Sequence, residues 1–441
     1  MRPLQLLARR AVTGWVLIVL SCCPAHAQLS TVFKNVFNSF LITDLQVSPG
    51  PHAGHFIPAA NQADSVLVPA LNSLIYNNIA SFPISSASTG ILFDFASGQP
   101  VRVPTSLGPI FGETARPVGA GKLALEVSYN YLDMNRIRGI PTDQMQFTFT
   151  HAHLVPGDTL GSDPTESDYM TVSMDMHVHA SMAAIIASYG VTKDLDIGFA
   201  IPLIQMSVSG TATAVINSYT FAHFGFAFHY FGGNAQIPQL TTTQPYSQSA
   251  TGVGDIAIRG KYSFLRSSDA DAAALVDVRL PTGKQEDFLG TGKTTVRVWG
   301  ILSRRMGEMT PHINIGYAHK PAELESDAVE FRAGFESLLL SDLTFALDIL
   351  GQIDVNSSKA IHLLPGSVLI VNRPITGSMT EQFIPLSNIP DSNGDNLYNA
   401  SMGFRFAPSE KFMLFANILV PLNSAGLRTT LAPTVGLSAN L

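Results

Sequence analysis

Cysteine is nearly absent from this 441-residue sequence, and both copies, Cys22 and Cys23, lie side by side near the N-terminus. The absence of cysteine from Pro24 to Leu441 excludes a disulfide framework and thiol chemistry from almost the whole chain. Long apolar runs are also missing from this part, and a membrane-spanning helix needs about 20 apolar residues. The mean hydropathy is nevertheless slightly positive, so the apolar residues must be spread among polar ones and not gathered in a membrane-spanning helix.

Basic residues are scarce as well. The chain has 26 lysines and arginines against 33 acidic residues, which gives a net charge of −7. The first 27 residues hold three arginines and no acidic residue, so removing them lowers the net charge to −10. An acidic protein is a poor ligand for a polyanion, and we expect no nucleic acid among its partners.

Residues 1–27 have the pattern of a secretory signal peptide. Its basic region, apolar region and small-x-small cleavage motif are Arg2, Arg9 and Arg10; residues 15–20; and Ala25-His26-Ala27. We expect export by the general secretory pathway and a mature chain that starts at Gln28. A lipoprotein modified at Cys22 is an alternative, but Leu20 suits that cleavage site poorly.

Residues 28–120 differ from the rest of the chain. Apolar residues recur at helical spacing from Val32 to Leu41 and from Leu67 to Ile75, with Ser-, Pro-, Gly- and Asn-rich stretches between and after them. We interpret this part as a periplasmic or lumen-filling plug with one or two short helices. A largely disordered tail is the alternative.

From about residue 121 onward, segments of roughly ten residues alternate apolar and polar side chains and end at turns or long polar loops. Ile256, Ile258, Tyr262 and Phe264 share one face of such a segment. No helical pattern intervenes to cover that face. The sequence therefore predicts an all-β fold, a transmembrane antiparallel β-barrel in residues 121–441, with lipid outside and a wet lumen inside.

Thirteen such segments can be identified. Their expected lipid-facing residues are Leu123, Leu125, Val127, Tyr129 and Tyr131; Met145, Phe147 and Phe149; Met174, Met176, Val178, Ala180 and Met182; Ile197, Phe199 and Ile201; Gly254 to Phe264; Val276, Val278 and Leu280; Val296, Val298 and Leu302; Ile313, Ile315 and Tyr317; Val329, Phe331 and Phe335; Leu343, Phe345, Leu347 and Ile349; Tyr398, Met402, Phe404 and Phe406; Phe412, Leu414, Ile418 and Val420; and the strand that ends at Leu441.

Single-chain bacterial barrels have an even number of strands, so we expect 12 or 14, with 14 preferred because residues 90–95 also alternate. Short turns near 190–194, 266–271, 305–310, 338–342 and 408–410 alternate with long loops near 210–250, 281–292, 353–395 and 421–428. The chain closes on Gly436, Ala439 and Leu441, a moderate match to the C-terminal signal of outer-membrane barrels.

Several motifs resemble those of a known family. They are Gly252-x-Gly254-Asp255, Gly260-Lys261-Tyr262, Leu280-Pro281-Thr282-Gly283, Tyr189-Gly190-Val191-Thr192, Ile201-Pro202-Leu203 and Asp287-Phe288-Leu289-Gly290-Thr291-Gly292. Together they resemble outer-membrane proteins described as phenol-degradation (meta-pathway) transporters, a group similar to the long-chain fatty-acid transporter barrels. The resemblance covers residues 170–320 best. It implies passage of small hydrophobic or aromatic compounds across the outer membrane.

The expected lumen-facing positions are rich in charge of both signs. We predict that they line the lumen and act either in selectivity or as internal salt bridges between adjacent strands. These positions are Glu126, Asp175, His177, His179, Asp255, Arg259, Lys261, Asp277, Arg279, Arg297, Glu330, Arg332, Asp348 and Arg405, with Glu336 on the same faces.

Two histidine pairs have a spacing that could bind a metal ion. His177 and His179 share a face with Asp175, and His151 and His153 occupy the preceding segment. Barrel histidines more often serve as hydrogen-bond partners, so we predict no metal site and no cofactor. The alternation places His151 and His153 on the lipid-facing side, at the membrane interface.

Two other stretches mimic ligand-binding loops. Residues 287–294 resemble a phosphate-binding loop, but Asp287 stands where the first glycine is needed and a strand follows instead of a helix. Asp391-x-Asn393-Gly394-Asp395 has calcium-loop spacing, but Met402 stands in place of the bidentate glutamate. We expect neither ligand.

The sequence thus favours a passive channel for small apolar solutes in a bacterial outer membrane, and not an enzyme. Its expected partners are outer-membrane lipid and lipopolysaccharide, the barrel-assembly machinery and the solute. A barrel lipid hydrolase, which needs a paired Ser and His, and a structural or adhesive barrel with binding loops are the alternatives.

Overall fold

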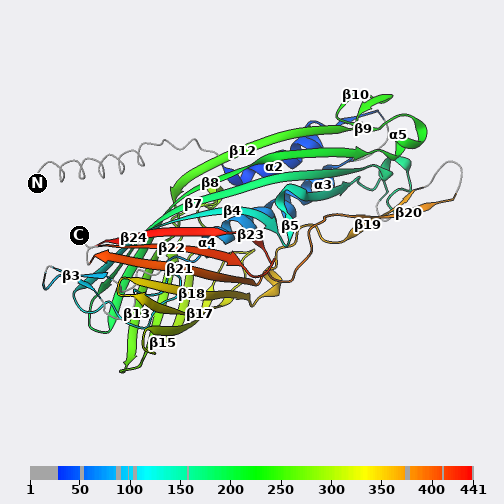
Figure 1. The fold of residues 1–441 in the computed structure, drawn as a ribbon. Coiled ribbons are helices and arrows are strands. Elements are labelled where there is room, and N and C mark those ends of the chain that lie inside the picture. The colour runs from blue at the N-terminus through cyan, green and yellow to red at the C-terminus, as the bar shows by residue number, and fades with distance from the viewer. Residues whose placement is uncertain are drawn as a thin grey trace, which may run out of the picture.

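The chain folds into a closed antiparallel barrel of 12 strands (Figure 1). This computed structural model describes residues 28–49, 54–85, 91–97, 99–102, 107–155, 158–372, 378–409 and 412–439. The predicted signal peptide lies outside these residues. In the described part of the chain, no helix combines the length and the hydropathy that crossing a membrane requires.

Consecutive strands pair around the wall, and β24 pairs with β4 to close it, for example Leu437 with Val127. The wall consists of β4 (Lys122–Ile137), β7 (Tyr169–Gly190), β8 (Leu195–Asn217), β12 (Thr241–Val253), β13 (Ile256–Arg266), β14 (Ala270–Leu280), β15 (Thr295–Arg304), β16 (Met309–His319), β17 (Ala328–Leu340), β18 (Leu343–Asp354), β21 (Leu397–Ser409), β22 (Phe412–Pro421) and β24 (Ala432–Ala439).

The preference for 14 strands is wrong, and the alternative of 12 is confirmed. Both β12 and β13 pair with β8 and so occupy one wall position, with a break at Gly254-Asp255. The strand β6 (Met145–Thr150) pairs only with the distal part of β7, beyond the end of the β4–β7 ladder. Residues Ile91–Asp94 form β2, a short hairpin with β3 (Gln99–Arg102) that touches only the start of β4. Neither β6 nor β2 is a full wall strand.

Shorter elements decorate the ends of the barrel. They are β1 (Gln46–Val47), β5 (Ile140–Pro141), η4 (Thr142–Gln144), η5 (Pro164–Ser167), α5 (Tyr219–Phe224), β9 (His229–Tyr230), β10 (Gly232–Asn234), β11 (Ile237–Gln239), η6 (Gln285–Asp287), η7 (Ser357–Lys359), β19 (Ser367–Asn372), β20 (Thr380–Pro385) and β23 (Leu427–Thr429). Four of the five predicted short turns are confirmed as hairpin connections, and the fifth, 408–410, lies partly outside the described residues. The predicted long loop 210–250 is shorter than expected, because β8 runs to Asn217 and β12 starts at Thr241.

The exterior of most of the wall is apolar, as predicted. Five of its residues, each 44–50% exposed, are Val127, Tyr129, Phe199, Ile258 and Val298. The side chains between them in sequence point to the opposite face. An apolar outer band of this kind suits contact with acyl chains.

Along β7, the apolar residues change from the outer face of the sheet to the inner face, which we call the phase reversal. Near the short turn, Ile185 and Tyr189 are exposed, as a lipid-facing surface requires. Farther from this turn, Met174, Met176 and Val178 are at most 1% exposed, and polar side chains occupy the outward positions. The expectation that these methionines face lipid is therefore wrong, and so is the same expectation for Met145, Phe147 and Phe149 on β6.

The N-terminal helices explain the reversal. These helices are not part of the barrel wall, and they pack on the inner face of its long strands (Figure 1). They are η1 (Leu29–Thr31), α2 (Val32–Asn38), η2 (Ser39–Thr43), α3 (Ile57–Gln62), η3 (Ala63–Leu67) and α4 (Val68–Ser81). Phe37 meets Phe147 and Phe149 edge to face, and Phe33 meets Tyr246 of β12. Here the sheet faces a helical layer on one side and water on the other, so its apolar residues point inward. The predicted helices are confirmed, and the described residues of this segment are not a disordered tail.

Candidate functional site

The inner face of the barrel carries a network of buried ion pairs. Arg405 lies 3.1 Å from Glu126, and both side chains are fully buried. Arg259 of β13 contacts Asp277 of the neighbouring strand β14 at 2.9 Å, and Arg297 of β15 contacts Glu330 of β17, across the intervening β16, at 3.4 Å. Lys261 and Arg279 complete the network through Asp196 and Asp277, at 3.7 Å each. The pairing between adjacent strands that the sequence indicated is present.

Residues 107–119, which we call the strap, form neither helix nor strand, precede β4 and run across the inside of this wall. At one end, the amide of Leu107 donates to Thr344 Oγ1 of β18 at 3.2 Å. At the other end, the amide of Val118 donates to Asp196 of β8 at 2.9 Å. Most residues of the strap are buried. Because β18 and β8 lie on different sides of the closed sheet, the strap runs along the inner face from one side of the barrel to the other, near the end with the short turns.

Inward-facing side chains hold the strap by its backbone. The carbonyl oxygens that accept hydrogen bonds are those of Pro109 from Arg405 at 2.8 Å, Phe111 from Arg332 at 2.6 Å, Glu113 from Asn314 at 2.9 Å, Thr114 from Lys261 at 3.4 Å and Ala115 from Ser263 at 2.7 Å. Hydrogen bonds from charged donors contribute about 1.5–3 kcal/mol each. Three of the residues predicted to line the lumen, Lys261, Arg332 and Arg405, thus anchor the backbone of this strap.

Side chains of the strap also enter the charge network. Glu113 lies 3.3 Å from Arg259, which already contacts Asp277, and Arg116 lies 3.5 Å from Asp271. Gly112 packs against His312, so closely that a Cβ there would overlap the imidazole ring. The strap is therefore fitted to the wall both by charge and by shape.

His312 is a central residue that the sequence analysis missed. Its Nδ1 lies 3.0 Å from Glu336 and its Nε2 lies 2.7 Å from Asp348, and all three side chains are buried. The signal was available, because His312 and Asn314 alternate with the lipid-facing residues Ile313 and Ile315. A single histidine among uncharged residues, however, does not stand out in the sequence as a lumen-facing acid or base does.

Asp255 has a different role from the other acidic residues. Its carboxylate accepts hydrogen bonds from the amides of Gly283 and Thr291, both at 3.0 Å. The loop 281–292 is thereby folded back over the end of the barrel, with Phe288 buried. The motifs Gly252-x-Gly254-Asp255 and 287–292 thus act as two halves of one loop anchor, and a Cβ at Gly290 would collide with the carboxylate.

Three predicted lumen residues do not lie in the lumen. The side chains of Asp175 and His177 are 43% and 53% exposed on the outer face of β7, 3.2 Å apart. His179 on the same face contacts Asp133 at 3.2 Å. These assignments are wrong for the reason given above, because the inner face of this part of β7 packs on helices.

The remaining predicted residues, Glu126, Asp255, Arg259, Lys261, Asp277, Arg279, Arg297, Glu330, Arg332, Asp348 and Arg405, are buried or nearly so on the inner face. Their part in solute selectivity stays a prediction.

The calcium-like loop is occupied by an arginine. Arg138 grips Asp395 with two nitrogens, at 2.9 and 3.0 Å, and lies 3.9 Å from Asp391. Asp391 also contacts His362 at 2.7 Å. Partial burial raises the pKa of Asp391, but the hydrogen bonds from His362 and the amide of Ser392 outweigh it and hold the pKa below its usual value. These carboxylates are held as ion pairs.

The interior leaves little open space next to the strap. A cavity of about 10 Å³ lies beside the strap, among Glu113, Arg259 and Arg297. A second cavity, of about 90 Å³, has no strap residue in its lining and lies between Phe82, Trp299 and Arg428. By contrast, a basin of about 780 Å³ opens at the end with the long loops, with Tyr76, Phe288 and Leu324 in its lining. The basin has the size of a small-molecule site, and the two smaller cavities do not.

Comparisons with known proteins define no family. No family model matches the sequence, and no curated protein matches it. Similar solved structures include an outer-membrane channel from Pseudomonas putida F1 (TM-score 0.40, 12% identity, covering 74% of this chain and 97% of that one). Others are a FadL homologue from Pseudomonas aeruginosa (0.32, 8%, 72% and 89%) and the toluene transporter TodX of Pseudomonas putida (0.26, 10%, 72% and 89%). Values this low establish neither a family nor a substrate for this chain.

Proposed function

We propose that this protein is an outer-membrane channel that passes small hydrophobic or aromatic compounds by passive diffusion and that its strap closes the lumen. The observation that carries the proposal is the strap itself, residues 107–119, which crosses a closed barrel on hydrogen bonds from the wall. A barrel with an apolar exterior and polar interior is suited to span a lipid bilayer. A segment tied across its lumen is suited to limit what passes.

The proposed path starts at the basin beside the long loops, where Pro69, Pro321 and Leu324 offer apolar surface to a solute. The inner network of ion pairs lies beyond it. We propose that the strap excludes hydrophilic solutes and that solute passage requires it to move. Outer-membrane lipid, lipopolysaccharide and the barrel-assembly machinery remain the proposed partners.

A lipid hydrolase would need a serine activated by a histidine. In the described part of the chain, Ser218 and His229 both contact Asp168, at 3.2 and 2.8 Å, so the carboxylate is a hydrogen-bond partner of the serine as well as of the histidine. No observation therefore favours the enzymatic alternative over a channel.

The proposal is tested by uptake in Gram-negative cells whose own hydrophobic-compound channels have been removed. Uptake of radiolabelled toluene is compared between cells with and without this protein, with a disaccharide as the hydrophilic control. We expect faster toluene uptake and unchanged disaccharide uptake. Equal toluene uptake in both strains would refute the proposed function.

A disulfide lock tests the part played by the strap. The amide of Ala115 lies 3.2 Å from Ser303 Oγ, and the chain from Pro24 onward has no cysteine of its own. The pair Ala115→Cys and Ser303→Cys should reduce toluene uptake to that of cells without the protein, and dithiothreitol should restore it. Each single variant is the control. Enhanced uptake that the lock does not change would retain the channel and reject strap movement.

A further inference from the structure

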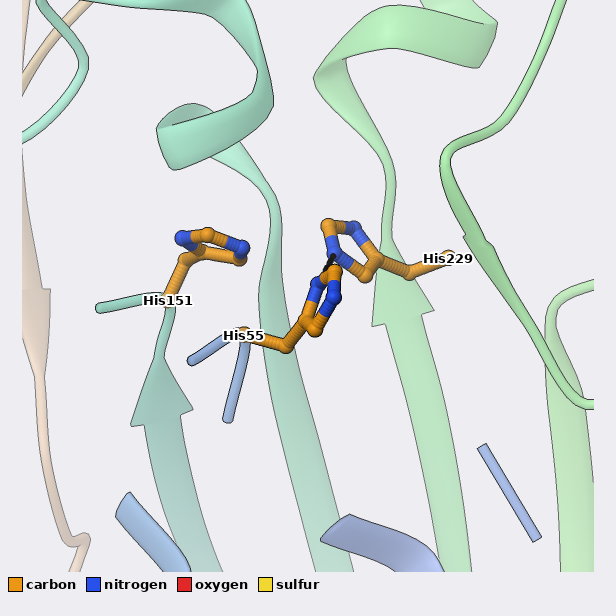
Figure 2. Close-up of side chains that lie close together, drawn as sticks. All are labelled: His55, His151 and His229. Atoms are coloured by element: carbon orange, nitrogen blue, oxygen red, sulfur yellow. Dashed lines mark hydrogen bonds between the residues drawn. The ribbon is translucent and has the colours of Figure 1, made fainter. Parts of the chain in front are cut away.

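Three histidines from distant parts of the chain meet at the long-loop end of the molecule (Figure 2). His55 precedes α3 in the N-terminal segment, His151 directly follows β6, and His229 lies in β9. The ring centroids of His151 and His229 are 4.9 Å apart, and those of His55 and His229 are 5.4 Å apart. His151 and His229 are buried, and His55 is half-buried. One candidate ligand atom from each residue lies within 4.8 Å of the others.

Hydrogen bonds select which nitrogen of each buried ring carries a lone pair. His229 Nδ1 lies 2.8 Å from Asp168 Oδ2, so this nitrogen donates a proton and Nε2 keeps its lone pair. His151 Nδ1 lies 2.6 Å from the carbonyl oxygen of Ala152 and donates to it, which makes Nε2 its ligand nitrogen. Both histidines are therefore held in the tautomer in which Nε2 can bind a metal ion.

The spacing of His55 and His229 fits a shared ligand. His55 Nδ1 lies 3.3 Å from His229 Nε2, and the dashed line in Figure 2 marks this contact. Two nitrogens bound to one tetrahedral zinc ion at about 2.0–2.1 Å lie about 3.3 Å apart. The same distance suits a hydrogen bond if His55 donates from Nδ1, so metal binding at Nδ1 requires His55 to change to the tautomer that is protonated on Nε2.

Asp168 supplies the outer-shell support that metal-binding histidines have. Its side chain is fully buried, and it also accepts hydrogen bonds from the amide of Tyr219 at 2.7 Å and from Ser218 Oγ at 3.2 Å. A carboxylate held in this way fixes the orientation of the imidazole and raises its basicity. Phe56 packs against His151 and His229 with its ring edge on and closes the apolar side of the cluster.

We propose that His55, His151 and His229 form a binding site for one divalent transition-metal ion, with zinc as the expected occupant. Three imidazoles with a carboxylate behind one of them suit zinc, copper or nickel and do not suit calcium or magnesium, which prefer oxygen ligands. The fourth position is left for water. A bound ion would tie the N-terminal segment to the end of β6 and to the loop that carries β9, in addition to the β1–β9 pairing and the hydrogen bond from the amide of Ala152 to the carbonyl oxygen of His55.

The test uses the full mature protein without a polyhistidine tag, in detergent, stripped with EDTA and dialysed. Cobalt is titrated and followed by its visible d–d absorption, zinc is then added as competitor, and bound metal is counted by mass spectrometry. We expect one ion per chain. We also expect affinity to fall as the pH is lowered, because the ligand must be the neutral imidazole.

Variants locate the site. His55→Asn is the mildest, because His55 has a positive φ of 41°, a conformation that asparagine tolerates better than most residues. It and His151→Gln should weaken cobalt binding more than about 100-fold, beyond the 10–100-fold typical of losing an outer-shell partner. The matched control is His177→Asn with His179→Asn, which removes the exposed pair on β7 and should leave binding unchanged.

Folding of each variant is checked by the shift in gel mobility that unheated barrels show. If the His151 variant fails this check, zinc absorption spectroscopy of the unaltered protein decides, with three imidazole nitrogens expected at about 2.0 Å. An oxygen-dominated shell, the absence of stoichiometric binding, or binding lost only with the His177 and His179 pair would each overturn the proposal.

Discussion

The guanidinium of Arg405 donates a hydrogen bond of 2.8 Å to the carbonyl oxygen of Pro109 while its other terminal nitrogen lies 3.1 Å from Glu126. One buried side chain thus joins the strap, strand β21 and strand β4. Neutralising or removing this arginine would free the strap and leave a buried carboxylate without its counter-ion. Substitution of Arg405 tests the ion pair.

Replacing Arg405 with methionine should destabilise the barrel by about 3–5 kcal/mol, because Glu126 would remain buried without its partner. Urea unfolding in detergent, followed by tryptophan fluorescence, measures the change. The double variant with Glu126→Gln should recover much of the loss, since it removes both charges. Equal destabilisation in the single and double variants would show that the ion pair is not the cause.

Enlarging Gly112 should displace the strap from the wall. A side chain there would overlap His312, which Glu336 and Asp348 hold on both sides, so the strap is the part that must move. We expect Gly112→Val to cost about 1–3 kcal/mol, as overpacking does, and to raise single-channel conductance several-fold. Gly260→Ala is the control, because a Cβ at Gly260 meets no atom within 4 Å. A conductance equal to that of the control would contradict the packing of the strap seen here.

The phase reversal along β7 predicts that an arginine introduced on the outer face of the barrel is costly at one position and tolerated at another. Val276→Arg places a charge on the apolar outer band and should cost about 2–4 kcal/mol near the bilayer midplane. His177→Arg places the same charge on the polar outer face of β7 and should change stability by no more than about 0.5 kcal/mol. Unfolding in lipid vesicles compares the two. A large cost at His177 would mean that this face lies in lipid or in the lumen.

The loop that contains Asp391 should loosen in acid. Its pKa lies below the usual value, so the contacts of the carboxylate are intact above the unfolded pKa and are lost as the pH falls through the folded one. Because the side chain is 41% exposed, the effect is local. Limited pepsin digestion between pH 5 and pH 2 should cut residues 386–396 faster as the pH falls. Asp391→Asn should be cut at a rate that varies less with pH.

Much of the barrel could be predicted from sequence because alternation reports directly on which side chains face lipid. Val127, Ile258 and Val298 obey it, and the acidic and basic residues between them are internal as expected. The prediction failed at Met174, Met176 and Val178 because alternation shows only that the two faces differ, not which face is inside. Where helices line the interior, apolar residues point inward, and Asp175, His177 and His179 are then turned to the outside.

The histidine cluster and the strap were beyond reach for a second reason. His55, His151 and His229 belong to three segments that are brought together only by the way the N-terminal helices pack on β6 and the β8–β12 loop. No spacing in the sequence encodes that meeting. The strap residues, likewise, are bound mostly through their backbone carbonyls, which every residue has and which leave no signature in side-chain identity.

Single-channel conductance in planar lipid bilayers, with and without residues 29–118, tests the central claim most directly. The shortened protein keeps β4 and the whole wall, and heat-dependent gel mobility confirms that its barrel is closed before it is measured. We predict a small or undetectable conductance for the full mature protein and a large, steady one for the shortened protein. Equal conductance from the two would show that the strap does not obstruct the lumen and would contradict the account.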